Sequence, residues 1–456
     1  MSARILCRSG VALLLALIVL VPGGQARGVS SPVPVNVRVA LVQQAGAVDF
    51  LVNGSYQLVD LSTSKSVSYP LNNQESYLLQ AQTGFIQVLK AGKPVASFKG
   101  PLAVREIKFR ASVLSGGGLV TEKNSPDGLL VLGAGGTTRP LSGVSEPVAM
   151  GAQGTAVLSG GCGLNLVSVA GKRYRGELEV RLDDTGLTVI NELSLEEYLR
   201  GVVPCEMPAA WPAEALRAQA VAARSYVLWQ IKNTGNQPFH VTADQSSQVY
   251  GGYDAEDTAT DKAVAETGRI VALYKGEPIP AFFHSSSGGY TENSEDVWKT
   301  PLPYLKGKAD PFDRNDKHYN WQVTYTADQL KEQLAAAGYR FEKVIDLAEK
   351  ERTATGARVK RLLVSGTGPV GEAVYQEIYN ADNVRKALGL KSALFSLEKV
   401  YDQDKHLAAV VITGNGWGHG LGMSQWGALG MARKGYNYRD ILAYYYTGIE
   451  LAPYGR

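Results

Sequence analysis

Alternating apolar and polar residues make the first third of the chain β-rich. The alternation is clearest near the start of this region, at Val37, Val39 and Leu41. Glycine-rich stretches at 116–118 and 133–136 predict turns between further short strands. We therefore expect a β-rich module over residues 34–166. It carries no recognisable catalytic pattern, and we interpret it as a binding or packing module.

Two hairpins are predicted from turn residues between apolar runs. Asn53-Gly54 is a favoured two-residue turn, and it would join residues 49–52 to 55–59. The turn at 183–186 would join strands 177–182 and 187–193. We expect the second hairpin to lead into the next domain, which we place at 172–450.

Apolar residues then recur at helical spacing over residues 214–231. The recurring positions are Leu216, Ala220, Ala223 and Val227. Pro212 suits the first turn of a helix, because the amide it lacks would be unpaired there. The many alanines allow close approach of another backbone, so we expect a buried helix.

Glu206 lies between Pro204 and Pro208, just before this helix. Each proline restricts the residue before it to extended geometry, so the sequence predicts a stiff, extended loop that positions a carboxyl. The alternative is a surface acid in an ordinary connector. On the helix, Arg217 has an i,i+3 partner in Glu214, whereas Arg224 has no acid three or four residues away. Its partner must lie elsewhere in the fold or in a ligand.

A glycine-rich segment at 414–427 follows a predicted strand at 410–413 and precedes a predicted helix at 423–433. Alternating glycines permit positive φ or a close backbone approach to a ligand. No Lys-Ser/Thr follows them, which argues against a phosphate loop. His419 lies within the loop, and Trp417 and Trp426 suit either sugar faces or a core.

A third cluster, at 284–292, follows a predicted hairpin formed by residues 269–274 and 279–283. It begins with His284 and Ser285 and contains paired glycines. Polar loops at strand ends often carry chemistry. An ordinary Ser/Gly loop with an exposed histidine is the alternative.

The charged composition of residues 327–350 predicts a helix, and residues 359–364 are predicted to form a strand. We expect them to belong to a lobe inserted at about 321–398 that closes a groove. The fold class expected for the whole chain is α+β.

The N-terminus has the layout of a signal peptide. Arg4 and Arg8 precede an uninterrupted apolar run at 11–21, which is short of the ~20 residues a spanning helix needs. We expect residues 1–26 to be cleaved or to remain as a membrane anchor, and the protein to be exported to the periplasm or cell envelope. Cys162 and Cys205 could then pair there.

The amino-acid composition restricts the classes of binding partner that are expected. The 456 residues carry a formal net charge of +3, and this near-neutral balance does not favour nucleic-acid binding or polybasic membrane docking. The length is sufficient for two or three domains.

The motifs, in their order, resemble the SpoIID/LytB family over about residues 172–450. The resemblance is carried by Tyr174-Arg-Gly-Glu-Leu-Glu-Val, Leu195-Glu-Glu-Tyr-Leu-Arg-Gly-Val-Val-Pro, Glu206-Met-Pro, Ala218-Gln-Ala-Val-Ala-Ala-Arg-Ser-Tyr, Phe283-His-Ser-Ser-Ser-Gly-Gly, Gly418-His-Gly-Leu-Gly-Met-Ser-Gln-Trp-Gly-Ala and Tyr444-Tyr-Tyr-Thr-Gly. Sporulation members of that family are lytic transglycosylases that cut glycan strands stripped of stem peptides.

The resemblance implies that Glu206 is the catalytic acid and that peptidoglycan glycan strands are the substrate. We expect a set of substrate-binding residues around it: Arg217, Arg224, His284, Ser285, His419, Ser424 and Gln425. Such an enzyme needs one acid, whereas a two-carboxylate hydrolase needs a second, and none is obvious in the motifs. An apolar setting formed by Met207, Trp211 and the alanine-rich helix would raise the pKa of Glu206, and a nearby arginine would oppose that rise.

Some members of the family bind zinc through histidines and cysteines near the His-Ser motif. That motif has no nearby cysteine here, so we predict no metal and no cofactor. Two other functions remain open. One is a non-catalytic amidase enhancer or wall-binding protein of the LytB type, with an N-acetylmuramoyl-L-alanine amidase as partner. The other is a cysteine hydrolase using Cys205 with His284 or His419.

Overall fold

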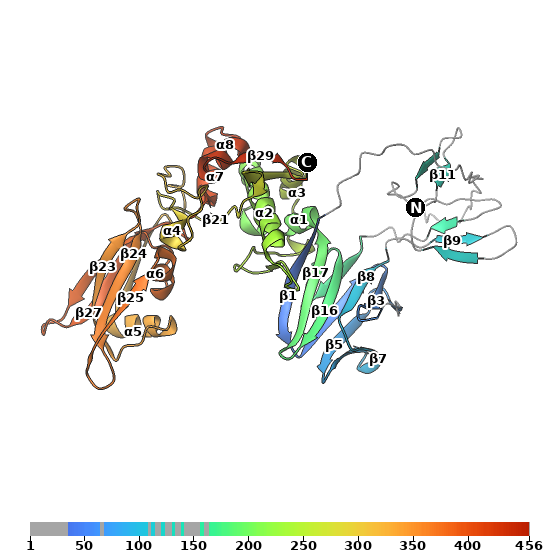
Figure 1. Cartoon of the computed structure of the whole chain (residues 1–456), viewed down its shortest axis with the longest axis horizontal. Coiled ribbons are helices and arrows are strands. Elements are labelled where there is room, and N and C mark those ends of the chain that lie inside the picture. The colour runs from blue at the N-terminus through green and yellow to red at the C-terminus, as the bar shows by residue number, and fades with distance from the viewer. Residues whose placement is uncertain are drawn as a thin grey trace, which may run out of the picture. The chain divides into compact units, whose positions relative to one another are not determined.

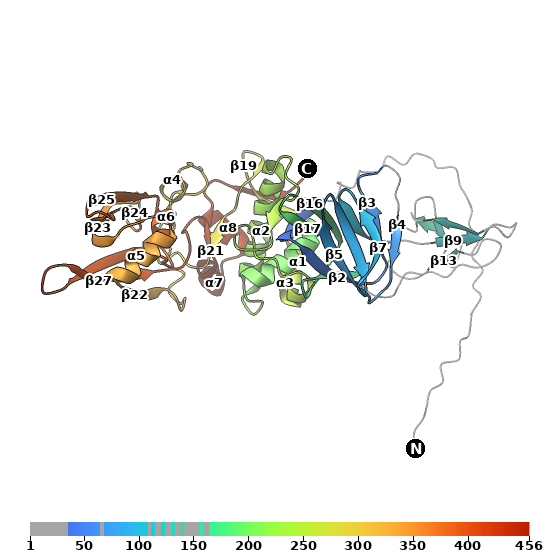
Figure 2. The ribbon, with the colours of Figure 1, turned by 90° about the horizontal axis from the view of Figure 1, so that it is seen from below.

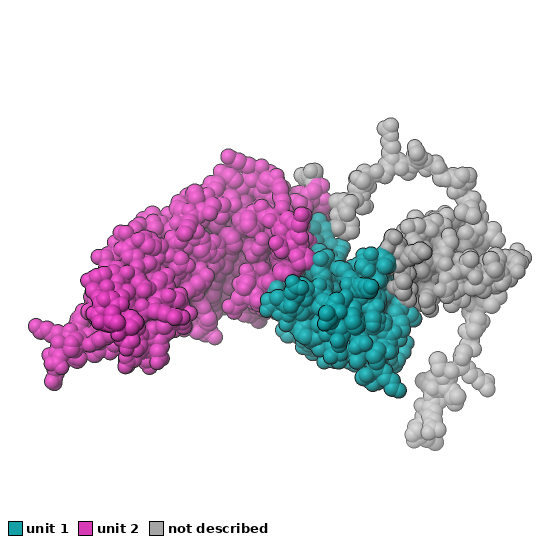
Figure 3. All heavy atoms as spheres, turned by 60° about the horizontal axis from the view of Figure 1, so that its bottom comes forward, with its two compact units in different colours: residues 1–193 teal, residues 194–456 magenta. Residues whose placement is uncertain are grey.

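The computed structural model describes most of the chain in two compact units, Met1–Leu193 and Ser194–Arg456, which Figure 3 colours separately. The described residues are 35–63, 68–107, 111–114, 120–123, 130–132, 138–140, 156–158 and 164–455. The predicted N-terminal signal or anchor segment, the glycine-rich turns at 116–118 and 133–136, and Cys162 lie outside them. None of the described helices is both long and apolar enough to cross a membrane.

The first unit is built from β-strands, as the alternating pattern predicts. A six-stranded sheet has the order β15-β14-β2-β5-β6-β7. Its strands are β2 (Ala47–Asn53), β5 (Ser76–Gln82), β6 (Phe85–Lys90), β7 (Lys93–Phe98), β14 (Leu166–Val169) and β15 (Lys172–Tyr174). A second sheet has the order β1-β17-β16-β8-β3-β4. Its strands are β1 (Asn36–Ala45), β3 (Tyr56–Asp60), β4 (Ser68–Leu71), β8 (Leu102–Glu106), β16 (Glu177–Asp183) and β17 (Gly186–Ser194).

Short strands lie between these two sets. They are β9 (Ala111–Leu114), β10 (Val120–Lys123), β11 (Leu130–Leu132), β12 (Thr138–Pro140) and β13 (Ala156–Leu158). Strands β10, β9 and β13 form one small sheet, and β11 pairs with β12.

The hairpin predicted at Asn53-Gly54 is wrong. Strand β2 pairs with β5 and β14, whereas β3 pairs with β4 and β8, so the chain passes from one sheet to the other here. The amide of Gly54 donates to the Asn73 side chain at 2.8 Å, and the amide of Ser55 donates to Asn165 at 3.2 Å. These side-chain bonds replace the cross-turn bonds of a hairpin.

The second predicted hairpin is confirmed. Strands β16 and β17 pair antiparallel from Glu177 opposite Glu192 to Asp183 opposite Gly186. Strand β16 also pairs with β8, which ties the hairpin to the first unit. The contact boundary therefore falls after Leu193, later than the domain start at 172 that the sequence motifs indicate.

The second unit combines helices with short strands. The helices are α1 (Leu195–Glu206), α2 (Ala213–Asn233), η2 (Tyr253–Ala255), α3 (Thr258–Glu266), α4 (Ser294–Val297), α7 (Gln425–Arg433) and α8 (Tyr438–Tyr445). The strands are β18 (Val241–Thr242), β19 (Ile270–Tyr274), β20 (Glu277–Pro278), β21 (Phe283–His284), β28 (Met423–Ser424) and β29 (Glu450–Pro453). Strand β19 pairs with β20 and, on its other edge, with β29. The second strand predicted at 279–283 is wrong, because the residues that pair with β19 are Glu277 and Pro278, directly after the turn.

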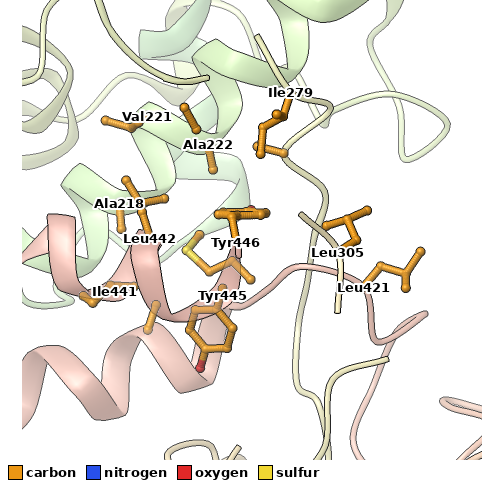
Figure 4. Packing of buried hydrophobic residues seen from close by; sticks show 14 of the residues in the cluster. Ala218, Val221, Ala222, Ile279, Leu305, Leu421, Ile441, Leu442, Tyr445 and Tyr446 are labelled. Carbon is orange, nitrogen blue, oxygen red and sulfur yellow. The ribbon is translucent and has the colours of Figure 1, made fainter. Parts of the chain in front are cut away.

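Helix α2 is buried, which confirms the expectation from its alanines. Ala218, Val221 and Ala222 have no exposed surface, and they pack in one cluster with Ile441 and Leu442 of α8 (Figure 4). Because alanine adds little bulk, α8 and the segment after β20 can approach the helix closely.

The inserted lobe, defined here as β22 to β27, has its own core. Its elements are β22 (Asn320–Thr326), α5 (Ala327–Ala336), β23 (Lys343–Arg352), β24 (Val359–Thr367), β25 (Ala373–Tyr379), α6 (Ala381–Ala387), β26 (Phe395–Tyr401) and β27 (Leu407–Asn415). They form two three-stranded sheets, β22-β27-β26 and β23-β24-β25, with α5 and α6 beside them (Figures 1 and 2). The lobe extends past the predicted end at 398, because β27 is the central strand of its sheet.

The helix predicted over 327–350 is confirmed only in its first part, Ala327–Ala336. Helix α5 gives way at Gly338, whose φ is +91, and the chain continues as β23. Val344 and Leu347 of this strand are buried in the lobe core, and tertiary packing overrides the charged, helix-compatible composition.

Candidate active site

Glu206 is the last residue of α1, so the expected extended loop is wrong. Pro204 lies within the last turn, and the amide of Met207 still donates to the carbonyl of Val203 at 2.9 Å. Met207 is extended, with φ −132 and ψ 135, as the position before Pro208 favours. The second proline therefore ends the helix, and Glu206 is presented from a rigid helix terminus.

The carboxyl of Glu206 accepts two hydrogen bonds from neutral donors. The backbone amide of Val249 donates to Oε1 at 3.0 Å, and the side-chain Nε2 of Gln425 donates to Oε2 at 3.3 Å. In the described parts of the chain, no lysine or arginine forms an ion pair with this carboxyl. Its partners therefore orient the group without fixing its charge.

Burial raises the pKa of Glu206, and the hydrogen bonds from Val249 and Gln425 partly oppose the rise. The C-terminal end of α1 also disfavours a negative charge, because helix dipoles place partial negative charge there. Met207 is fully buried beside it in sequence. The ring of Trp211 packs edge-on against Trp426 at 5.2 Å between centroids. Burial therefore shifts the pKa of Glu206 in the direction that the sequence analysis attributes to an apolar setting.

The second and third motifs meet as paired strands. Strand β21 runs parallel to β28, with His284 opposite Ser424. The amide of Trp426 donates to the carbonyl of Ser285 at 3.0 Å, and the hydroxyl of Ser424 accepts from the amide of Gly427 to begin α7. Gln425 follows directly and reaches Glu206. Three segments that lie far apart in the sequence are therefore linked by contacts.

The glycines of these motifs allow two backbones to approach each other. A Cβ on Gly416 would lie 2.6 Å from the amide nitrogen of Gly288, and one on Gly418 would lie 2.7 Å from Cβ of His284. Both residues also have positive φ, at +77 and +121. The alternating glycines thus serve loop-to-loop packing, and a ligand is not needed to explain them.

His284 and His419 lie together, with ring centroids 5.3 Å apart. Nδ1 of His284 contacts the carbonyl of Leu421 at 3.1 Å, and the amide of Leu421 donates to Nδ1 of His419 at 2.9 Å. Burial lowers the pKa of His284 well below its ordinary value and lowers the pKa of His419 to about 4. Both imidazoles are therefore neutral at pH 7.

The donor set around these histidines does not fit a zinc site. Each ring has one nitrogen engaged with the backbone of Leu421, so the pair offers at most two ligands through Nε2. The described residues contain no group of three or more His, Cys, Asp or Glu side chains arranged to hold a metal ion. A catalytic zinc needs three protein ligands and a structural one needs four.

The two arginines singled out by sequence are engaged elsewhere. Arg224 is fully buried, and its guanidinium pairs with Glu196 at 2.7 Å and donates to the carbonyl of Val264. Arg217 pairs with Glu214 and Glu266. The missing partner of Arg224 is thus found within the fold. These contacts do not support the expected role of either arginine as a substrate contact.

Several residues of the site escaped the sequence analysis. Asp313 is buried and accepts hydrogen bonds from Ser286, Ser287 and the amide of Gly288, all within 2.9 Å. Arg358, the residue before β24, donates to the carbonyl of Ser287 at 2.6 Å. Both hold the loop after His284. No local motif marks them, because their partners are remote in sequence.

Two family models match separate stretches of the chain. The model of the Stage II sporulation protein family (SpoIID) matches residues 183–274, and a Domain of unknown function (DUF8618) matches residues 304–422, which include the whole inserted lobe.

Three relatives extend over more of the chain. An uncharacterized protein of Brachyspira hyodysenteriae is 35% identical over 295 residues, which are 63% of this chain and 74% of that protein. Stage II sporulation protein D of Bacillus subtilis is 32% identical over 278 residues, 58% of this chain and 76% of the relative. The Amidase enhancer of Bacillus subtilis is 33% identical over 336 residues, 64% of this chain and 45% of the relative. With its motifs joined in one site, the chain belongs to the SpoIID/LytB family.

Proposed function

We propose that this protein is a lytic transglycosylase that cleaves peptidoglycan glycan strands, with Glu206 as its only acid and base. The observation that carries the proposal is the environment of the Glu206 carboxyl. It is held by two neutral donors, it has no cationic partner among the described residues, and its pKa is raised. Such a group can be protonated in one step and ionised in the next.

The reaction needs both states in turn. Protonated Glu206 gives its proton to the glycosidic oxygen, and the bond between C1 of the muramic residue and that oxygen breaks. The resulting carboxylate accepts the proton of the muramic C6 hydroxyl, whose oxygen attacks C1 and closes a 1,6-anhydro ring. The acid is regenerated and no water is consumed.

Gln425 can serve both protonation states. Its Nε2 donates to the carboxylate, as in the structure, and after a rotation of the amide its Oε1 can accept from the protonated acid. The amide of Val249 can only donate, so it stabilises the carboxylate that forms after proton transfer. The two contacts keep the group oriented throughout the cycle.

A two-carboxylate hydrolase has less support. In the described residues, no second carboxylate is among the groups that shift the pKa of Glu206. Inverting and retaining enzymes both place two acids about the same glycosidic bond. Each acid of such a pair commonly shifts the pKa of the other.

Mass spectrometry of the products tests the proposal. Purified glycan strands incubated with the protein should yield fragments ending in 1,6-anhydro-muramic residues. Reducing ends would instead show hydrolysis, and intact strands would show that the protein does not cleave glycan on its own.

The similarity to the Amidase enhancer favours a second candidate, a non-catalytic protein that stimulates an N-acetylmuramoyl-L-alanine amidase. Addition of this protein to such an amidase acting on cell walls separates the two. Stimulation that persists in the Glu206→Gln variant supports the enhancer, and stimulation that requires Glu206 supports glycan cleavage.

We also propose that the chain is exported to the cell envelope. The basic N-terminus followed by the apolar run at 11–21 supports this, since peptidoglycan lies outside the cytoplasmic membrane. Fractionation of cells expressing the full chain, with N-terminal sequencing of the product, distinguishes a cleaved segment from a retained anchor.

A further inference from the structure

The hairpin of β24 and β25 carries the most exposed large apolar side chains of the described residues. Val370, in the turn, is 90% exposed, and Tyr375 and Tyr379 of β25 are 69% and 54% exposed. The two tyrosines share one face of the strand, because side chains alternate along it. Apolar side chains that gather on one surface are typical of an interaction site, whereas single ones are not.

Only one edge of β25 is paired. Among the described strands, β24 alone pairs with it, and the sheet has the order β23-β24-β25. This pairing runs without a register shift from Arg361 opposite Tyr379 to Thr367 opposite Ala373. Because β25 is a regular strand, its outer edge presents an even row of backbone donors and acceptors that another strand can use.

The opposite edge of the same sheet is built differently. Strand β23 pairs with β24 through three register shifts, and it carries the charged residues Lys343, Asp346, Glu349, Lys350, Glu351 and Arg352. Bulges and charged side chains are common means of preventing an edge strand from pairing. Strand β25 reads Ala-Val-Tyr-Gln-Glu-Ile-Tyr, with Glu377 as its one charged residue and no proline. One edge is thus protected, and the other is left able to pair.

The sequence of β25 is complementary to itself in one antiparallel register. When two copies of the strand are centred on Gln376, Tyr375 faces the partner's Glu377, and Val374 faces the partner's Ile378. The two Tyr375 rings then lie diagonally across the centre, within reach of each other. A register centred on Glu377 would instead place two carboxylates opposite each other, which is destabilising.

We propose that β25 pairs antiparallel with β25 of a second copy of this chain, centred on Gln376. The pairing joins two three-stranded sheets into one across a two-fold axis. It satisfies the outer backbone groups of both strands and covers Tyr375 of each copy. The same patch serves both copies, so the contact closes on itself as a dimer. This inference goes beyond the proposed function and does not depend on it.

Sedimentation equilibrium of the purified full-length chain over a range of concentrations tests the dimer. We expect a reversible equilibrium between monomer and dimer. Tyr375→Glu places a second carboxylate opposite the partner's Glu377, and the symmetry repeats this contact twice in the dimer. The substitution should therefore raise the dissociation constant at least about tenfold. Because Tyr375 is 69% exposed, the folded monomer should tolerate the change, which circular dichroism checks.

A charge exchange tests the register. Adding Glu377→Lys to Tyr375→Glu makes the facing side chains opposite in charge again, so the double variant should recover the dimer. Failure of the double variant to dimerise more tightly than Tyr375→Glu would overturn the register centred on Gln376.

Ile345→Glu is the matched control. It places the same charge on β23, at an apolar residue that is 48% exposed on the protected edge, and it should leave the dissociation constant unchanged. Equal weakening by Ile345→Glu, or a dimer that Tyr375→Glu does not weaken, would overturn the proposal. A wild-type chain that is monomeric at every concentration would also overturn it, and would leave an extended segment of a different protein as the occupant of this edge.

Discussion

Two glutamates of the second unit, Glu206 and Glu292, show how the partners of a carboxyl decide its use. Glu206 is held by an amide and a side-chain amide, both neutral. Glu292 is fully buried, and its Oε1 accepts from Thr353, Thr355 and the guanidinium of Arg358, the last at 3.2 Å. Each carboxyl is linked to an element that lies far away in the sequence.

The difference lies in the presence of a cation. Arg358 pairs with Glu292 at 3.2 Å, and the same guanidinium also donates to the carbonyls of Ser287 and Tyr290. This pair therefore joins the inserted lobe to the loop after His284. Glu206 has no cation to fix its charge, so its proton can be exchanged. The first arrangement suits structural support and the second suits catalysis.

The largest effect is expected from Glu206→Gln. The amide can neither give nor take the proton, so glycan cleavage should fall by at least about 10²–10⁴-fold. The Glu206→Gln variant should be at least as stable as the wild type. Because burial raises the pKa of Glu206, the folded wild type loses stability as pH rises from the ordinary pKa through the raised one, and the variant lacks this loss.

Cleavage assays and urea unfolding at pH 5 and pH 8 check both expectations. Wild-type turnover by the variant would end the single-acid mechanism. Unfolding of the variant at both pH values would show that Glu206 is instead required for the fold.

Arg358→Met should produce the opposite outcome, a loss of stability. It leaves the charge of Glu292 buried without compensation, which should lower the free energy of unfolding by about 3–5 kcal/mol. Arg361→Met, three residues along on β24, is the matched control, because its side chain is partly exposed and its carboxylate partners lie 3.6 and 3.7 Å away. That change should cost at most about 1 kcal/mol. Equal unfolding midpoints for the two variants would contradict the structural role of the buried pair.

Gln425→Leu tests, through the pH dependence of activity, how a neutral donor affects the pKa of Glu206. The Gln425 hydrogen bond lowers the pKa of Glu206, so its removal should raise that pKa further. Activity that needs the protonated acid declines as pH rises through this pKa, and the decline in kcat/KM should therefore move to higher pH. Gln376→Leu on β25 removes an amide remote from Glu206 and should leave the profile in place. A shift to lower pH in Gln425→Leu would contradict the assignment.

Cys205→Ser is expected to have little effect. Cys205 is exposed and precedes Glu206 on α1, and a conservative surface substitution commonly changes free energies by no more than about 0.5 kcal/mol, or roughly twofold in rate. Steady-state cleavage rates measure this. A folded but inactive Cys205→Ser protein would favour the cysteine hydrolase over the single-acid enzyme.

Removal of metal ions should change nothing. His284 and His419 have no third ligand among the described residues, so exhaustive dialysis against a chelator should leave the cleavage rate as it was. If activity were lost on chelation and restored by added zinc, the protein would have a zinc ligand in addition to these two histidines.

Much of the architecture could be predicted from local patterns. The helix near 214–231, the hairpin at 177–193, the strand near 269–274 and the helix ending before Gly435 follow from spacing and turn residues. These signals are local, since helical periodicity and turn conformations depend on residues only a few positions apart. The motifs also indicated Glu206 and Gln425 as site residues.

Other features depend on contacts that no local pattern encodes. Residues 343–352 form a strand because Val344 and Leu347 pack into the lobe core, and Asn53-Gly54 joins two sheets because remote asparagine side chains take up the amides. The prolines around Glu206 indicated a rigid carboxyl, but its place at a helix end and its neutral partners were decided by the tertiary structure. The amide of Val249 and the Arg358–Glu292 pair have no signature in sequence, because a backbone donor or a buried ion pair acquires its role only when distant segments meet.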